Sequence, residues 1–336
     1  MKRNTDLDLI RAILIILMIL IHIVSFGNAY PHLKAGILSF MMPTFLIITG
    51  YLVNIEKTER QMRNYLKCLA LPYVIMVTGF SVLSYYMPVR DGITELSLSQ
   101  IGEKIFITSI GPYWFIQTMI ICGTLYYFCF SGRNWNDLRR NYTKRDTYAS
   151  LFVFAVTLLL ISETPALSAS AAAYYFIGVV IRQSKTEWNK LFRHEFFAII
   201  LWIYLLNHDD WYDWGSLAIV FSCWCCISTL LLLQHLLDAP ERFKDISPKI
   251  GKVAKVTNRI KDTLLYIGRN TLPIYLFHPI FTMAAKFYHP LFSWDPSEIS
   301  FAAVTILLAI TGSLLIAKMM EKTKLAYLFG KGKLLR

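Results

Sequence analysis

Charged residues are scarce in this sequence. Only 17% of its 336 residues are Asp, Glu, Lys or Arg, whereas 55% are hydrophobic and 15% are aromatic. Soluble domains carry about 25% charged residues, so the composition excludes an ordinary soluble domain of this length. Acidic residues are the rarer sign, with 22 Asp and Glu against 34 Lys and Arg, which leaves a formal net charge of +12.

Cysteines are also few, and their spacing is not that of a metal site or a disulfide framework. The six cysteines all lie within or beside apolar runs: Cys68, Cys122, Cys129, Cys223, Cys225 and Cys226. We interpret them as packing residues and expect no metal. The sequence has no evident internal repeat, which gives no support to a transporter built from inverted repeats.

Apolar runs recur along the whole chain and predict an all-α, polytopic membrane helix bundle in a single domain, residues 1–336. Ten spans are expected, at about 7–26, 35–53, 69–87, 112–130, 148–162, 168–182, 194–207, 215–237, 271–287 and 299–317. The first span follows Lys2 and Arg3, as the core of a signal peptide would. Its apolar region is long, however, and no clear small-x-small cleavage site follows it, so we retain it as a helix of the protein.

Basic residues gather in alternate loops, which orients the bundle. With the N-terminus in the cytoplasm, the inner segments hold all lysines and arginines except Arg11, Lys34, Arg90, Lys104 and Lys286. The positive-inside rule then places both termini in the cytoplasm, as expected for the inner membrane of a bacterial-type cell. The net positive charge follows from this topology, and we expect no nucleic-acid partner.

Three loop segments have distinctive compositions. The basic inner connection 238–270 predicts an amphipathic helix with its lysines on lipid phosphates, or alternatively a contact with a polyphosphate ligand. The second half of the outer segment 88–111 predicts another amphipathic helix. The outer loop 207–215 carries His208, Asp209, Asp210 and Asp213, which indicate a solvated or sugar-contacting loop or, alternatively, metal ligands. Residues 318–336 form a basic cytoplasmic tail.

The first span carries polar residues, which are rare in membrane-spanning helices and usually have a functional role. Asp8, Arg11 and His22 interrupt an otherwise aliphatic segment, and a charge inside a membrane costs several kcal/mol. Arg11 and His22 lie roughly three turns apart on one helix face, about 16 Å along the axis. This polar stripe indicates a path through the membrane. In the alternative interpretation, Arg11 snorkels to the interface with Asp8 as its i, i+3 partner, and His22 lies in the far headgroup layer.

Two other spans depart from plain lipid-facing helix. In the second span, Pro43 frees a backbone carbonyl and Thr49-Gly50 permits a close helix contact. The fourth span carries Trp114 and Gln117 near its outer end, where an interfacial aromatic belt alone would explain the tryptophan.

Polar groups also mark the ninth span and the loop after the second span. Tyr275 and His278 stand at i, i+3 on one face, with His278 directly before a proline. Arg60, Arg63 and Lys67 have a spacing that puts them on one side of a helix, and such bases hold ligand phosphates.

Taken together, these stretches resemble a known family. The start DLIRA with His22, then MPTFLIITGYL, YWF, YYFIGVVIR and TLPIYLFH, in this order, look like the acyltransferase-3 family of integral-membrane acyltransferases, and most like its fucose-4-O-acetylase-like branch. The resemblance covers nearly the whole chain, and Arg11 and His22 match the family's Arg/Lys-x10-His motif. It implies a coenzyme-A-linked acyl donor reached from the cytoplasm and a glycan or glycolipid acceptor. It also implies that His22 is essential for catalysis and that Arg11 supports it.

The chain departs from the family pattern in two places. The family's Arg-x-x-Arg pair normally lies close to a Leu-Pro-Pro-Tyr stretch, which is LALPY at 69–73 here. Arg60 and Arg63 have the right spacing but stand further upstream, and Lys67 is nearer, so which bases act for the pair stays open. The usual SGY is Thr49-Gly50-Tyr51, which keeps a hydroxyl.

The chemistry of acyl transfer fits the same residues. Transfer from a thioester to an alcohol needs a base of near-neutral pKa, and histidine meets this need. We therefore expect an O-acetyltransferase that uses acetyl-CoA to modify a sugar hydroxyl of a cell-envelope polysaccharide or lipid-linked glycan. The residues expected to contact the acceptor or to support the site are Asp8, Trp114, Gln117, Tyr275 and His278. His278 is also the second candidate base or, alternatively, a histidine whose hydrogen bonds are satisfied inside the helix bundle. A glycolipid flippase with Arg11 and His22 as a polar relay is the alternative function, and the oligomeric state stays open.

Overall fold

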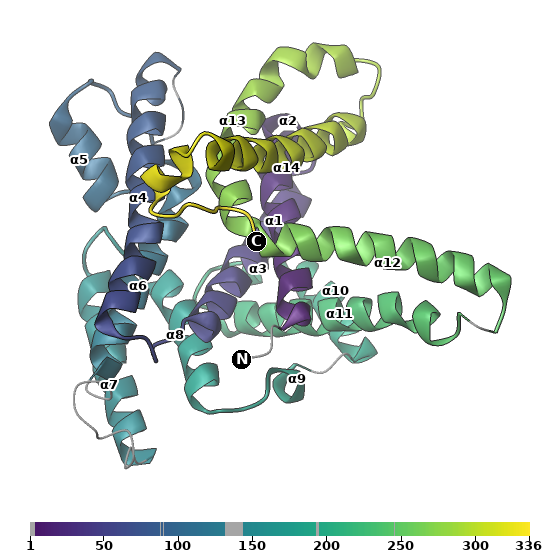
Figure 1. The fold of residues 1–336 in the computed structure, drawn as a ribbon, viewed down its shortest axis with the longest axis horizontal. Helices are drawn as coiled ribbons and strands as arrows, with labels where there is room; N and C mark the ends of the chain where they lie inside the picture. Colours follow the sequence, from purple (N-terminus) through teal and green to yellow (C-terminus); the bar gives the residue numbers. More distant parts are fainter. Residues whose placement is uncertain (1–3, 88, 90, 132–143, 193–194, 245) are drawn as a thin grey trace. The chain divides into compact units, whose positions relative to one another are not determined.

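In the part of the chain described by this computed structural model, every element of regular secondary structure is a helix, and there is no strand (Figure 1). The described residues are 4–87, 89, 91–131, 144–192, 195–244 and 246–336. Lys2, Arg3 and residues 132–143, in the basic connection between the fourth and fifth expected spans, lie outside them. The all-α prediction is confirmed for the described residues.

A helix occupies each of the ten segments expected to span the membrane. The helices there are α1 (Thr5–Ile21), α3 (Pro31–Leu52), α4 (Glu59–Tyr86), α6 (Trp114–Ser131), α7 (Lys144–Ser162), α8 (Ala169–Gln183), α10 (Phe196–Leu206), α11 (Leu217–Arg242), α13 (Thr271–Tyr288) and α14 (Ile299–Lys322). Six helical segments within the described residues are long and apolar enough to cross a membrane: Pro31–Leu52, Glu59–Tyr86, Gly111–Phe130, Arg145–Ser162, Leu217–Arg242 and Ile299–Lys322. The count of ten spans and the cytoplasmic placement of both termini stay predictions.

Both expected amphipathic segments are helices. The outer one is α5 (Leu98–Phe106), and the inner one is α12 (Pro248–Arg269). On α12, Val253, Val256 and Ile260 are exposed along one face. The contact of this face with lipid stays a prediction.

The helices group into two compact units. Unit 1 comprises Met1–Phe45, Thr186–Thr323 and Lys333–Arg336, and unit 2 comprises Leu46–Lys185 and Lys324–Gly332. The single membrane domain expected from the sequence stays a prediction.

Helix α1 forms the centre of unit 1 and packs against α11, α12, α13 and α14. Asn4 caps its start, because the Asn4 side chain accepts a hydrogen bond from the Asp6 backbone N–H at 2.9 Å. Leu9, Ile10 and Leu14 are fully buried, so α1 is apolar on several sides, as a helix surrounded by others must be.

Helices α12 and α1 cross in direct backbone contact. A Cβ atom built on Gly268, in the last turn of α12, would overlap the carbonyl oxygen of Asp8. At its other end, α12 packs alongside the last turns of α11 (Figure 1). Lys261 pairs with Asp238 there, and the Asn258 side chain donates to Glu241 at 2.7 Å. Glycine at 268 is therefore a requirement of the α1–α12 crossing.

Unit 2 contains a second crossing of the same kind, between the end of α3 and α8. A Cβ on Gly50 would overlap the carbonyl oxygen of Tyr175, and a Cβ on Gly178 would overlap that of Ile47. The close helix contact predicted at Thr49-Gly50 is confirmed. Beside it lies an aromatic core that includes Tyr126, Phe154 and Tyr175, fully buried by α6, α7 and α8.

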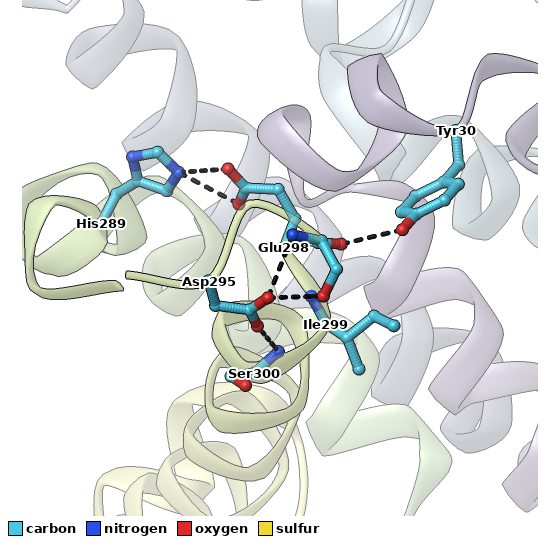
Figure 2. Close-up of polar contacts among 7 residues, drawn as sticks. Tyr30, His289, Asp295, Glu298, Ile299 and Ser300 are labelled. Atoms are coloured by element: carbon cyan, nitrogen blue, oxygen red, sulfur yellow. Dashed lines mark hydrogen bonds and ion pairs between the residues drawn. The ribbon is translucent and has the colours of Figure 1, made fainter. Parts of the chain in front are cut away.

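The connection between α13 and α14 is held by a polar network (Figure 2). The Asp295 carboxylate accepts hydrogen bonds from the Ser297 backbone N–H and hydroxyl and from the Ser300 N–H, at 3.0, 2.5 and 2.8 Å. His289 pairs with Glu298 at 2.9 Å, and the Tyr30 hydroxyl donates to the Ser297 carbonyl at 3.0 Å. These bonds fix the start of α14, where Glu298 has a left-handed backbone conformation that is uncommon for a residue other than glycine.

We expect Gly268→Ala to destabilise the protein, because the added methyl group meets backbone that cannot rotate away. Overpacking typically costs about 1–3 kcal/mol, and the loss would appear as a lower midpoint of thermal unfolding in detergent. Gly251→Ala on the same helix is the matched control, since its Cβ would lie 3.4 Å from the Lys244 carbonyl oxygen. That variant should be neutral or stabilised by about 0.5–1 kcal/mol. Equal effects of both would contradict the backbone contact.

Asp295 should give stability that depends on pH. Hydrogen bonds from Ser297 and Ser300 hold the pKa of its carboxyl at about 2, below its ordinary value of 3.8. A carboxyl whose pKa is lower in the folded state stabilises the protein above its unfolded pKa and loses this effect as pH falls toward the folded pKa. The difference in unfolding midpoint between the wild type and Asp295→Asn should therefore be present at about pH 6 and shrink toward about pH 2. Asp262→Asn, which changes an exposed carboxylate of α12, is the matched control.

Candidate active site

A cluster of charges surrounds the first turns of α1. The Asp8 side chain is buried, with its Oδ1 atom 3.8 Å from Nη1 of Arg11 and its Oδ2 atom 4.0 Å from Nε of Arg269. Arg11 also donates a hydrogen bond from Nη2 to the Thr271 hydroxyl. A buried carboxylate is tolerated when it is paired and hydrogen-bonded. The i, i+3 pairing of Asp8 and Arg11 is thus confirmed, but the guanidinium contacts the beginning of α13 as well.

His22 stands where α1 ends. The helix expected over 7–26 is interrupted here: α1 ends at Ile21, and the chain continues as α2 (Val24–Ala29). The His22 backbone N–H bonds to the Ile19 carbonyl at 3.1 Å, which is a tighter turn than an α-helix has. The His22 Nδ1 atom lies 2.8 Å from the carbonyl oxygen of Met18.

His278 lies within α13 and is fully buried. Its Nδ1 atom is 2.7 Å from the carbonyl oxygen of Tyr275. In a regular helix that carbonyl would accept from the N–H of residue 279, but Pro279 has none. The proline therefore leaves an acceptor for the histidine that precedes it.

The two imidazole rings face one another. Their centroids are 5.3 Å apart and their planes are nearly perpendicular, at 83°. Because a carbonyl oxygen only accepts hydrogen bonds, both histidines must donate from Nδ1, so Nε2 of each neutral ring carries the lone pair. The buried Nε2 atom of His278 has no hydrogen-bond partner among the described residues. The Tyr275 ring lies 5.8 Å from that of His278, as their shared face predicts.

The bases predicted to hold a donor lie in unit 2. Arg60, Arg63 and Lys67 are exposed along the first turns of α4. A reciprocal capping box fixes the start of this helix: the Gln61 N–H bonds to the Thr58 hydroxyl and the Thr58 N–H to the Gln61 side chain. The prediction that the three bases share one helix is confirmed. Their role toward a ligand stays a prediction.

Gln117 and Trp114 belong to the same unit, at the start of α6. The Gln117 amide donates to the carbonyl of Ile107 at 3.1 Å and to that of Phe106 at 3.4 Å. It therefore holds the end of α5, and this amide group already has backbone partners. Trp114 is half-buried beside Phe115, with ring centroids 6.2 Å apart.

A comparison with known families covers nearly the whole chain. The family model described as an acyltransferase domain, Acyl_transf_3, matches residues 4–318. The chain belongs to the acyltransferase-3 family. No curated protein and no solved structure matches it. The fucose-4-O-acetylase-like branch stays a prediction. The match includes every helix of this membrane acyltransferase from α1 to α13.

Two polar residues beside the first turns of α1 were missed in the sequence. Arg269 and Thr271 reach α1 from either side of Asn270, where α12 gives way to α13. Their only sequence signal was a basic and a hydroxyl residue at the start of the ninth span. Among the side chains that the structure describes, no group of three His, Cys, Asp or Glu forms a metal site. The side chain of Asp209, part of the alternative metal set in the outer loop, lies outside the described residues.

Proposed function

We propose that this acyltransferase moves an acetyl group from acetyl-CoA to a sugar hydroxyl of a cell-envelope polysaccharide or lipid-linked glycan. The observation that carries the proposal is the pair formed by His22 and His278. Each ring is oriented through Nδ1 by a backbone carbonyl, and each presents Nε2 as a base. A base that a second group orients is the arrangement that general-base and nucleophilic catalysis require.

The reaction then proceeds in balanced steps. Nε2 of His22 takes the proton of the acceptor hydroxyl, and the oxygen attacks the thioester carbonyl. A carbon–oxygen bond forms and the carbon–sulfur bond breaks. The leaving thiolate takes the proton back from the imidazolium, which restores the neutral histidine. His278, in contact with His22, helps to fix the ring and is the second candidate for the same task.

Arg11 supports the donor on the same helix. It stands about 16 Å along the axis from His22, a length of the order that an extended pantetheine arm spans. Its partners Asp8 and Thr271 hold the guanidinium in place. Arg60, Arg63 and Lys67 bind the phosphates of the coenzyme, since basic side chains form charge-assisted hydrogen bonds with phosphate.

Replacing His22 should abolish transfer. General-base catalysis contributes typically about 10²–10⁴-fold, so His22→Ala and His22→Gln should both lose that factor, because an amide cannot accept the proton. The measurement is transfer of radiolabel from acetyl-CoA to envelope glycans by the purified, folded variants. His32→Gln, which changes an exposed histidine of α3, is the control. Activity of His22→Ala above about a tenth of the wild type would transfer the role to His278. Glycolipid movement without acetylation would support the flippase instead.

Neutralising the bases of α4 should weaken donor use. The triple variant Arg60→Gln, Arg63→Gln and Lys67→Gln should raise the KM for acetyl-CoA by about tenfold or more, as loss of charge-assisted phosphate contacts implies, with a smaller change for the acceptor. The matched control removes three exposed lysines of α12, namely Lys249, Lys252 and Lys255. If the α12 variant alone raised this KM, the polyphosphate contact would belong to the 238–270 connection.

A further inference from the structure

The segment 334–336 is hydrogen-bonded to unit 1 through its backbone. The N–H groups of Leu334 and Leu335 both donate to Oε1 of Glu321, at 2.6 and 2.7 Å. The N–H of Arg336 donates to Oδ1 of Asn270 at 2.8 Å, and the Asn270 amide donates back to the Arg336 carbonyl at 3.4 Å. Glu321 thus accepts two backbone N–H groups, and the Asn270 amide bonds both the N–H and the carbonyl of Arg336. Together these two side chains form a binding site for extended chain, which we name the seat.

Asn270 belongs to two helices at once. It ends α12 and begins α13, it is fully buried, and its amide also donates to the Tyr266 carbonyl at 2.9 Å. Its neighbours in the chain are Arg269 and Thr271, the two residues that reach Asp8 and Arg11. A shift of this corner therefore moves both partners of the α1 charges together.

We propose that Asn270 and Glu321 are positioning residues for Arg11, and that they act by binding the backbone of residues 334–336. With the segment seated, Asn270 has partners on both sides and holds Thr271 against the guanidinium. With the segment released, the buried Asn270 amide loses its partners in the segment, and the corner relaxes. The effect on catalysis rests on the proposed function, whereas the seat itself does not. In Figure 1 the end of the chain lies beside the end of α12.

The seat is tested by proteolysis, without reference to activity. Glu321→Ala and Leu335→Pro should each expose the bond after Lys333 to trypsin, since each removes part of the hydrogen bonding. The controls are Glu321→Gln, which keeps an oxygen acceptor, and Leu335→Ala, which keeps the N–H. Both should stay protected, and so should the wild type. Equal cleavage of all variants, or of none, would show that the segment is not seated in this way.

The positioning role is tested by coupling to Arg11. Glu321→Ala should lower kcat/KM for acetyl-CoA about tenfold, because small displacements of a positioned group are costly. Glu321→Gln should restore most of this loss. In an Arg11→Gln background, Glu321→Ala should cost nothing further, since the group it positions is gone. A full tenfold loss in both backgrounds, or none in the wild type, would overturn the positioning role.

Coupling is also measurable without turnover. If the wild-type protein transfers no acetyl group, the proposed function fails. The wild type, Glu321→Ala, Arg11→Gln and the double variant are then compared by their midpoints of thermal unfolding. If the shift in midpoint of the double variant differs from the sum of the two single shifts, the link between the seat and Arg11 is supported. If the double shift equals that sum, the link is overturned.

Discussion

Burial of the Asp8 carboxylate is the constraint on which unit 1 depends. A carboxylate removed from water must be paired and hydrogen-bonded or it costs several kcal/mol, and α1 alone supplies only Arg11. Arg269, at the corner where α12 meets α13, also lies beside this carboxylate, so that corner must lie against α1. Gly268 makes this possible because its missing side chain admits the Asp8 backbone. One buried charge thus brings α1 together with a corner of two consecutive helices that is far from it in the sequence.

The same arrangement separates two kinds of chemistry along α1. The first turns carry fixed charges and strong donors, which suit an anionic ligand. The far end carries His22, whose ring contacts that of His278 on α13. Close to this end, Ile23 and Phe26 pack with Ala285, Phe301 and Ala302. Charge and base therefore belong to one rigid helix without touching each other.

Much of this was accessible from the sequence, because local spacing is read directly from helical geometry. The ten helical segments, the Asp8–Arg11 pair and the shared face of Tyr275 and His278 all follow from periodicity. What could not be predicted were contacts across the chain: His22 with His278, Arg11 with Thr271, and the seat of residues 334–336. Gln117 illustrates the same limit from the other side. Its amide bonds to the backbone at the end of α5, and spacing alone did not predict those partners, while its acceptor-contacting or supporting role stays a prediction.

The end of α1 at His22 also determines which nitrogen of the imidazole can act. In a continued helix, the backbone N–H of residue 22 would point at the Met18 carbonyl, but here it bonds to Ile19 instead. The Met18 oxygen is thereby left to the imidazole, which it holds by Nδ1. Winding the helix by one more residue would bring a competing donor to that oxygen and release the ring. The residue at which α1 ends therefore decides that Nδ1 of His22 carries the proton and that Nε2 is the nitrogen able to accept one.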